Sequence, residues 1–127
     1  CKSPPYSLVD QACLIWNTVH STIAKWKEVH DDWIIVRHED LSSNPLAEFQ
    51  FLFGKLNLPL NQRTLAFIEQ ASGINNPVEQ TPGKEFQRNS KANIKNWQTR
   101  LTADEIHSIR LKTQKYSKLF YDDSDWT

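Results

Sequence analysis

The chain has 127 residues, with 15 basic and 15 acidic side chains and a formal net charge of zero at pH 7. A chain of this length fits one domain, and its balanced charge argues against binding nucleic acid or an anionic membrane through its overall field. Because the sequence lacks both a run of about 18 apolar residues and a basic start followed by an apolar stretch, we expect neither a membrane span nor a signal peptide.

The cysteines indicate the cellular compartment of the chain, and the absence of methionine bears on whether it is a fragment. Cys1 and Cys13 are too few for a disulfide framework and show no zinc-ligand spacing. We interpret them as incidental thiols in a reducing compartment, expect no metal, and predict a cytoplasmic location. The sequence contains no methionine, even at position 1. We therefore predict that residues 1–127 are a fragment or a processed chain rather than a translated start.

The first predicted element is a long amphipathic helix over residues 8–29. Consecutive prolines keep residues 1–6 in a loop, and Ser7 is a candidate N-cap. Apolar residues then recur with a period near 3.6, so the helix is amphipathic, and we interpret its aromatic residues as core rather than as a ligand platform. The recurring apolar residues are Leu8, Ala12, Ile15, Trp16, Val19, Ile23 and Trp26.

Residues 33–36, Trp-Ile-Ile-Val, form an apolar run that is rich in β-branched side chains. Such a run is typical of a strand buried on both faces of a parallel sheet. Polar residues 37–40 mark its carboxyl end, where ligands bind in open α/β sheets. We predict an α/β fold, mostly helical, with one or two parallel strands in this chain. Since one strand is not a sheet, a mostly α fold without this strand remains the alternative.

Two further helices are predicted after the strand. Asn44 and Pro45 suit the N-cap and first position of a helix that runs from residue 45 to about residue 57. Asn61 is a candidate N-cap for the next helix. We expect Gly73 to end that helix in the left-handed conformation.

Residues 74–96 show neither a helical nor a strand period, and a loop of this length is usually either functional or disordered. Its charge is mostly positive, with Glu85 set against it, which suits an anion clamp. A capping box of Thr102 and Glu105 then opens a last helix, and the acidic tail at residues 121–127 is expected at the surface. The basic residues of the loop region are Lys84, Arg88, Lys91, Lys95 and Arg100.

Several potentially reactive residues are interpreted as structural. The pair Gly83-Lys84 lacks the first glycine and the hydroxyl residue of a Walker-type loop. Cys13 lies on a helix without a partner base. The histidines outside the strand end are expected at the surface. They are His20, His30 and His107.

His38 stands beside Glu39 and Asp40, where a general base could lie. Neighbouring side chains on a strand point to opposite faces, however, so the three cannot converge. We interpret His38 as structural and expect Glu39 or Asp40 to accept hydrogen bonds from backbone amides of the following turn.

Two stretches of the sequence resemble landmarks of the sulfotransferase family. Residues 36–41, Val-Arg-His-Glu-Asp-Leu, precede an Asn-Pro pair, and the family commonly has a strand ending in Arg-Tyr-Glu-Asp-Leu there. His38 replaces the usual tyrosine. Residues 88–91, Arg-Asn-Ser-Lys, precede Trp97 and are similar to the family's late cofactor-contacting loop. Many cytosolic members have Arg-Lys-Gly at that loop, and this sequence looks closer to the bacterial and protein-tyrosine type.

The resemblance runs from about residue 6 to residue 121 and covers only the C-terminal half of the family's domain. It therefore implies that residues 1–127 are a single incomplete domain. It implies the C-terminal part of a P-loop-type sulfotransferase fold, which moves a sulfuryl group from 3′-phosphoadenosine-5′-phosphosulfate to a hydroxyl or amine acceptor. The donor's phosphate loop and the catalytic base have no counterpart here, so we expect the chain alone to be inactive. The residues implied to bind the donor's 3′-phosphate are Arg88, Ser90, Lys91 and Lys95.

Three alternatives stay open at this point. The basic loop could be solvated and bind nothing. The chain could be a helical interaction module without catalysis. It could also belong to a nucleotide kinase-like enzyme, because a shared core architecture does not imply a shared function.

Overall fold

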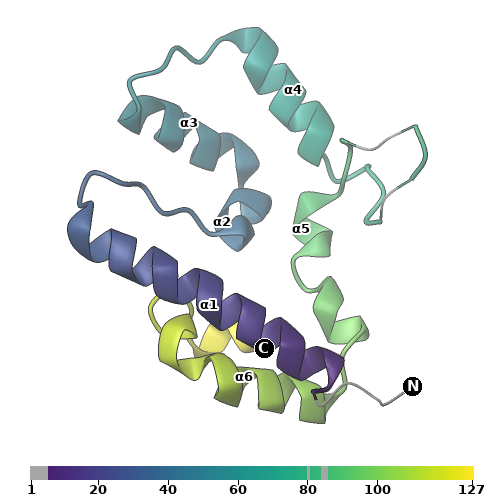
Figure 1. Ribbon diagram of the computed structural model, residues 1–127. Helices are drawn as coiled ribbons and strands as arrows, with labels where there is room; N and C mark the ends of the chain where they lie inside the picture. The colour runs from purple at the N-terminus through teal and green to yellow at the C-terminus, as the bar shows by residue number, and fades with distance from the viewer. Residues whose placement is uncertain (1–5, 80, 84–85) are drawn as a thin grey trace. The chain divides into compact units, whose positions relative to one another are not determined.

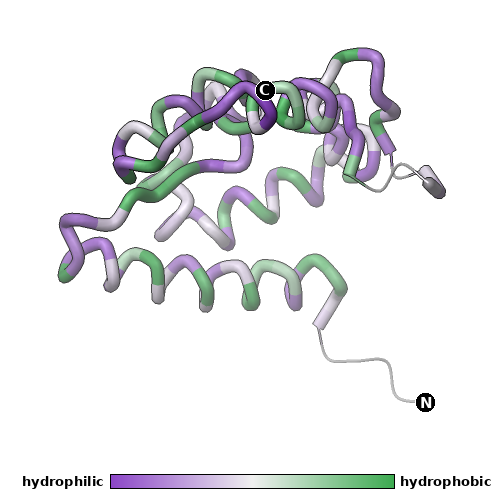
Figure 2. The backbone as a smooth tube through the Cα atoms, turned by 90° about the horizontal axis from the view of Figure 1, so that it is seen from above, coloured by the Kyte–Doolittle hydropathy of each residue, from purple (hydrophilic) through white to green (hydrophobic). Residues whose placement is uncertain are grey.

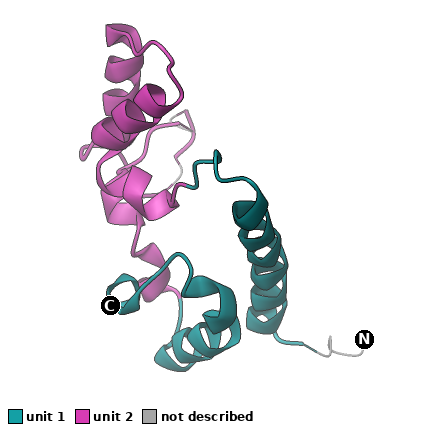
Figure 3. Cartoon of the chain, turned by 90° about the vertical axis from the view of Figure 1, so that its left-hand side faces the viewer, with its two compact units in different colours: residues 1–35, 101–127 teal, residues 36–100 magenta. Residues whose placement is uncertain are grey.

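The computed structural model describes residues 6–79, 81–83 and 86–127. Its regular elements are helices, which follow one another in the order α1 to α5, η1, α6 and η2 (Figure 1). The chain divides into two compact units (Figure 3). Unit 1 comprises Cys1–Ile35 and Leu101–Thr127, and unit 2 comprises Val36–Arg100. The predictions made for residues 1–5, Lys84 and Glu85 lie outside the described residues.

The predicted strand at residues 33–36 does not form, and the described ranges contain no strand at all. Residues 33–36 are irregular, with Trp33 49% exposed and Ile35 38% exposed. A β-branched run becomes a strand only where a neighbouring strand completes its backbone ladder and covers its faces. The described residues supply no such neighbour. The predicted α/β fold with parallel strands, and with it the P-loop-type architecture, is therefore wrong for this structure.

The polar residues expected at the strand end instead begin helix α2, His38–Ser43. Arg37 is the N-cap residue of α2. Its guanidinium donates from Nε and Nη2 to the two carboxylate oxygens of Asp40, at 2.9 and 2.7 Å. These hydrogen bonds lower the pKa of Asp40. Asp40 thus accepts from an arginine side chain, where we had predicted backbone amides of a turn.

Helix α1 of unit 1, Leu8–Val29, has the bounds that the sequence predicts. Ser7 is its N-cap, and the Ser7 hydroxyl accepts a hydrogen bond from the backbone N–H of Asp10 at 3.1 Å. The Asp10 carboxylate accepts the Ser7 backbone N–H in return, which completes a capping box. This carboxylate also pairs with Lys112 of α6, so the start of α1 is tied to a residue far along the chain.

Helix α6 of unit 1, Ala103–Ser117, begins with the predicted capping box of Thr102 and Glu105. The box lowers the pKa of Glu105, chiefly through the hydrogen bond from the Thr102 backbone N–H. The tail after α6 forms a 3-10 helix, η2, Asp123–Trp126. Arg110 of α6 pairs with Asp123 and lies over the Trp126 ring, 5.4 Å from its centroid. The acidic tail is therefore attached to α6, although Asp123 stays exposed as predicted.

The core of unit 1 lies where α1 packs on α6 (Figure 1). Cys13 is buried there, and burial raises the pKa of its thiol, which agrees with an inert residue. Asn17 donates to the backbone carbonyl of Lys112 at 2.8 Å. His20 is half-buried and stacks on Trp16 at 3.5 Å, so its predicted surface position is wrong. The prediction that the aromatic residues of α1 are core fails at Trp26, which is 48% exposed, whereas Trp16 is half-buried. The other two histidines, His30 and His107, are exposed as predicted.

Unit 2 contains α2, α3 (Pro45–Lys55), α4 (Gln62–Ser72), α5 (Ser90–Asn93) and the 3-10 helix η1 (Asn96–Thr99). Helix α3 packs against α2 and α4, and α2 also packs against α5. The predicted loop at residues 74–96 therefore contains a short helix and the start of another.

The helix ends of unit 2 follow the sequence in part. Pro45 is the first residue of α3, as predicted, but the Asn44 side chain makes no capping hydrogen bond among the described residues. Asn61 caps α4 by accepting from the Thr64 backbone N–H at 3.0 Å. Gly73 has an extended backbone, with φ −61°, so the predicted left-handed ending is wrong. Asn57, just after α3, is left-handed instead, with φ 52°. None of the described helices combines the length and the apolar character needed to span a membrane.

Candidate anion-binding segment

The four predicted donor-binding residues lie on one stretch of unit 2, residues 88–95, which we call the basic segment. Arg88 precedes α5, Ser90 and Lys91 are the first two residues of α5, and Lys95 is the N-cap of η1. Arg88 and Ser90 are half-buried, whereas Lys91 and Lys95 are exposed. The Lys91 carbonyl accepts a hydrogen bond from the Ile94 backbone N–H. The side chains of Ser90 and Lys91 make no hydrogen bond or ion pair with another described residue, so their side-chain donors are available to an anion.

The C-terminal end of α4 holds the start of the basic segment. The last carbonyls of a helix have no partner inside the helix and need donors from elsewhere. The Asn76 side chain donates to the carbonyls of Gln70 and Ala71, at 2.7 and 3.1 Å. The Arg88 backbone N–H also donates to the Ala71 carbonyl, at 2.8 Å. Asn76 further reaches the Arg88 carbonyl at 3.4 Å, so it links the helix end to the segment.

Asn89 fixes the next residue of the segment. Its side-chain amide donates to the Ile74 carbonyl at 2.9 Å, and its backbone N–H donates to the Pro77 carbonyl at 3.0 Å. Its side-chain oxygen accepts the Ala92 backbone N–H at 3.0 Å, which makes Asn89 the N-cap of α5. Ser90 is thereby held in place by the residue before it.

Neither asparagine was predicted as part of the site. Asn89 could have been identified from sequence, because asparagine directly before a short helical run is a common N-cap. Asn76 had no comparable local signal, since its three acceptors lie at positions 70, 71 and 88.

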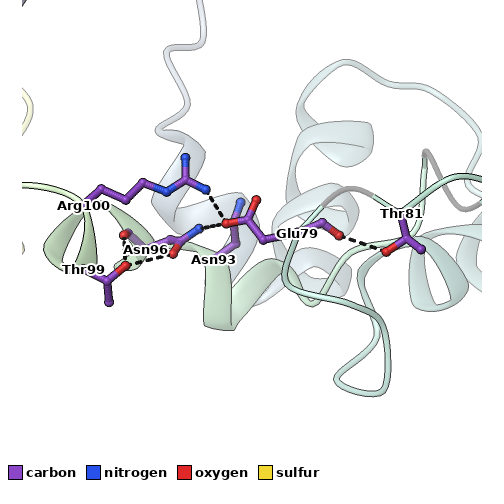
Figure 4. Close-up of polar contacts among 6 residues, drawn as sticks. All are labelled: Glu79, Thr81, Asn93, Asn96, Thr99 and Arg100. Atoms are coloured by element: carbon purple, nitrogen blue, oxygen red, sulfur yellow. Dashed lines mark hydrogen bonds and ion pairs between the residues drawn. The ribbon is translucent and has the colours of Figure 1, made fainter.

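Glu79 is a further residue that the sequence reasoning missed. Its carboxylate accepts hydrogen bonds from Asn96 and Arg100 (Figure 4). The Asn96 hydrogen bond, followed by the Arg100 hydrogen bond, lowers the pKa of Glu79, and the positive charge of Arg88 adds to the effect. Arg100 is therefore already paired, and the positive charge that the sequence assigns to this region is partly neutralised.

The structure also bears on His38 and on possible metal binding. His38 lies one turn from the buried Ser42 on α2, with 3.3 Å between His38 Nε2 and Ser42 Oγ, which agrees with a structural role. Within the part of the chain that the structure describes, no group of three His, Cys, Asp or Glu side chains could hold a metal ion.

Comparison with known proteins gives one informative similarity. No protein-family model matches the chain, and no solved structure matches it. Carbohydrate sulfotransferase 1 from Homo sapiens is 29% identical over 91 residues, which cover 69% of this chain and 21% of that protein. The chain thus spans about a fifth of the length of that relative. An aligned stretch that covers 69% of the chain must include the middle of unit 2, whichever residue the alignment starts from. The similarity supports a relationship to the sulfotransferases, which are enzymes.

Proposed function

We propose that the chain is part of a sulfotransferase that uses 3′-phosphoadenosine-5′-phosphosulfate as the sulfuryl donor. The similarity to a human carbohydrate sulfotransferase and the two sequence landmarks support the reaction class. The observation that carries the proposal is the construction of the basic segment. Its backbone is held at Arg88 and Asn89, while Ser90 and Lys91 keep their donors free of other described residues.

The role proposed for the segment is to bind the donor's 3′-phosphate. A guanidinium, a hydroxyl and an ammonium are good phosphate partners, and Arg88, Ser90 and Lys91 supply one of each. The 3′-phosphate is remote from the sulfuryl group, so its binding energy serves to position the donor in line with the acceptor. Lys95 is a weaker candidate. Arg100 contributes least, because Glu79 holds it.

The acceptor is proposed to be a hydroxyl or amine, and the name of the human relative favours a carbohydrate hydroxyl. The sequence shows no Walker-type phosphate loop and no assigned catalytic base. We therefore propose that the chain alone binds the nucleotide part of the donor but does not turn over.

Isothermal titration calorimetry with 3′,5′-adenosine diphosphate tests this role. The double variant Arg88→Ala/Lys91→Ala is expected to bind about 10- to 100-fold more weakly than the unaltered chain, because charged hydrogen bonds are lost. Lys25→Ala, an exposed lysine on α1, is the control and should leave the affinity unchanged. Equal affinity of the double variant and the unaltered chain would refute the assignment.

A helical interaction module without catalysis is the second candidate, and the exposed apolar side chains of α1 favour it. It predicts no affinity for 3′,5′-adenosine diphosphate. The same titration therefore separates the two functions.

A further inference from the structure

Helix α1 has two apolar faces, of which only one is covered. The covered face packs on α6 and carries Cys13, Trp16 and His20. The other face carries large apolar side chains that are exposed to solvent. Figure 2 shows hydrophobic residues recurring turn after turn along α1.

The exposed face has a regular pattern. Leu8, Ile15, Val19 and Trp26 are all exposed, and we call them the α1 stripe. With 3.6 residues per turn, these four positions fall within a sector of about 40°. They lie well away from the buried Cys13, which is about 140° from the centre of the stripe.

The surroundings of the stripe carry no charge. Within about 60° on either side of its centre, every position of α1 is apolar or uncharged. The helix has 22 residues, so this face is about 33 Å long. A continuous apolar surface of this kind marks an interface in a folded protein. The uncharged positions beside the stripe are Gln11, Ala12, Thr22, Ile23 and Val29.

The spacing of the stripe reads the same in both directions. Its residues are separated by seven, four and seven positions. If a second copy of α1 is laid against the first in the opposite direction, Leu8 faces Trp26 of the second copy and Ile15 faces its Val19. A twofold interface requires a surface that is complementary to itself in this way. We propose that the α1 stripe is the interface of an antiparallel homodimer.

The two ends of the stripe extend the same symmetry. Tyr6 is exposed just before Leu8. At the other end, Trp33 is exposed and packs edge-on against Trp26, with 5.5 Å between ring centroids. In the antiparallel pair, Tyr6 and Leu8 of one copy meet the two tryptophans of the other. Tyrosine and tryptophan are enriched at such interfaces.

The charge pattern favours a second copy over other partners. An uncharged apolar face is matched by another uncharged apolar face, and the stripe provides one on each copy. A helix that lies on a membrane usually carries Lys and Arg over its polar face. The polar side of α1 instead mixes Lys25 and Lys27 with Asp10 and Glu28. The dimer does not depend on the proposed sulfotransferase function.

Sedimentation equilibrium of the chain over a range of concentrations tests the proposal. The unaltered chain should be a dimer, and Ile15→Asp should weaken self-association by at least about 100-fold, because two charges then enter the interface. Leu14→Asp is the matched control. Leu14 and Ile15 are adjacent and both 65% exposed, but Leu14 lies about 120° from the centre of the stripe. Leu14→Asp should stay dimeric, and far-ultraviolet circular dichroism should show helix in both variants.

The antiparallel register has a test of its own. Leu8→Asp and Trp26→Lys should each weaken their homodimers, whereas an equal mixture of the two should form a heterodimer. Only antiparallel pairing places the new carboxylate opposite the new ammonium and keeps one Leu8–Trp26 contact intact. A chain that is monomeric at all concentrations, as expected if other segments of a longer protein cover the stripe, overturns the proposal. The proposal is also overturned if Ile15→Asp remains fully dimeric, or if the mixture of Leu8→Asp and Trp26→Lys forms no heterodimer.

Discussion

Each of the two units has its own kind of internal interaction. In unit 1, α1 and α6 begin with capping boxes and pack along one another, with an ion pair between Asp10 and Lys112. In unit 2, the segment after α4 is held by side-chain amides of Asn76 and Asn89 that bond to backbone carbonyls. Both units have packed helices, but only in unit 2 do side-chain amides hold an irregular segment to the end of a helix. The variants below test that contrast.

The largest expected effect is in the core of unit 1. Cys13→Asp places a carboxylate between α1 and α6 and should lower the free energy of unfolding by about 3 kcal/mol or more, because the charge loses its hydration. Urea unfolding followed by circular dichroism measures the change. Cys13→Ala is the control. It should lower the free energy of unfolding by clearly less than Cys13→Asp does, since it removes only a small apolar group. Equal costs for the two variants would place the side chain outside the core.

A smaller effect is expected in unit 2 from Asn76→Ala. The substitution removes the donor for carbonyls at the end of α4 and should cost about 1–3 kcal/mol. Hydrogen exchange of the Arg88 backbone N–H should speed up, because that N–H bonds to the same helix end. Asn75→Ala, at an exposed neighbouring position, should change little. If the Arg88 backbone N–H exchanges at the same rate in both variants, Asn76 does not hold the basic segment to the end of α4.

The capping boxes of unit 1 are expected to contribute about 1 kcal/mol each. Thr102→Ala removes the hydroxyl that accepts the Glu105 backbone N–H and should destabilise α6 by about that amount. Thr102→Ser keeps a capping hydroxyl and should stay near the stability of the unaltered chain. Thermal unfolding of the two variants checks the difference. A Ser variant as unstable as the Ala variant would argue against the cap.

The smallest effect is a pH dependence of unit 1. Hydrogen bonds from Lys112 and then Ser7 lower the pKa of Asp10 from 3.8 to about 2. A group whose folded pKa is lowered stabilises the fold above its unfolded pKa, and this contribution fades as the pH falls. Stability should therefore drop between about pH 4 and pH 2, and Asp10→Asn should flatten that part of the profile. A profile that Asp10→Asn leaves unchanged would show that the carboxylate is not coupled to folding.

Features encoded by neighbouring residues were predictable from the sequence. Ser7 and Asp10, and likewise Thr102 and Glu105, are three positions apart, so the helix starts in unit 1 could be predicted from local spacing. Residues 33–36 show the limit of such patterns. Their composition favours a strand, but a strand also needs a neighbour, and composition carries no information about neighbours.

The candidate site was predictable only as a stretch of residue types. The proposal of Arg88, Ser90, Lys91 and Lys95 comes from their chemistry and from the family resemblance. The ion pair of Glu79 with Arg100 joins residues 21 positions apart, and the contacts of Asn76 depend on where α4 ends. Such contacts are decided by tertiary packing, which a local pattern does not contain.

The most direct test of the central claim is nuclear magnetic resonance of the chain during titration with 3′,5′-adenosine diphosphate. The account predicts amide shift changes over residues 88–95, with no comparable changes in α1 or α6. Changes confined to α1 and α6, or no change at saturating ligand, would contradict it.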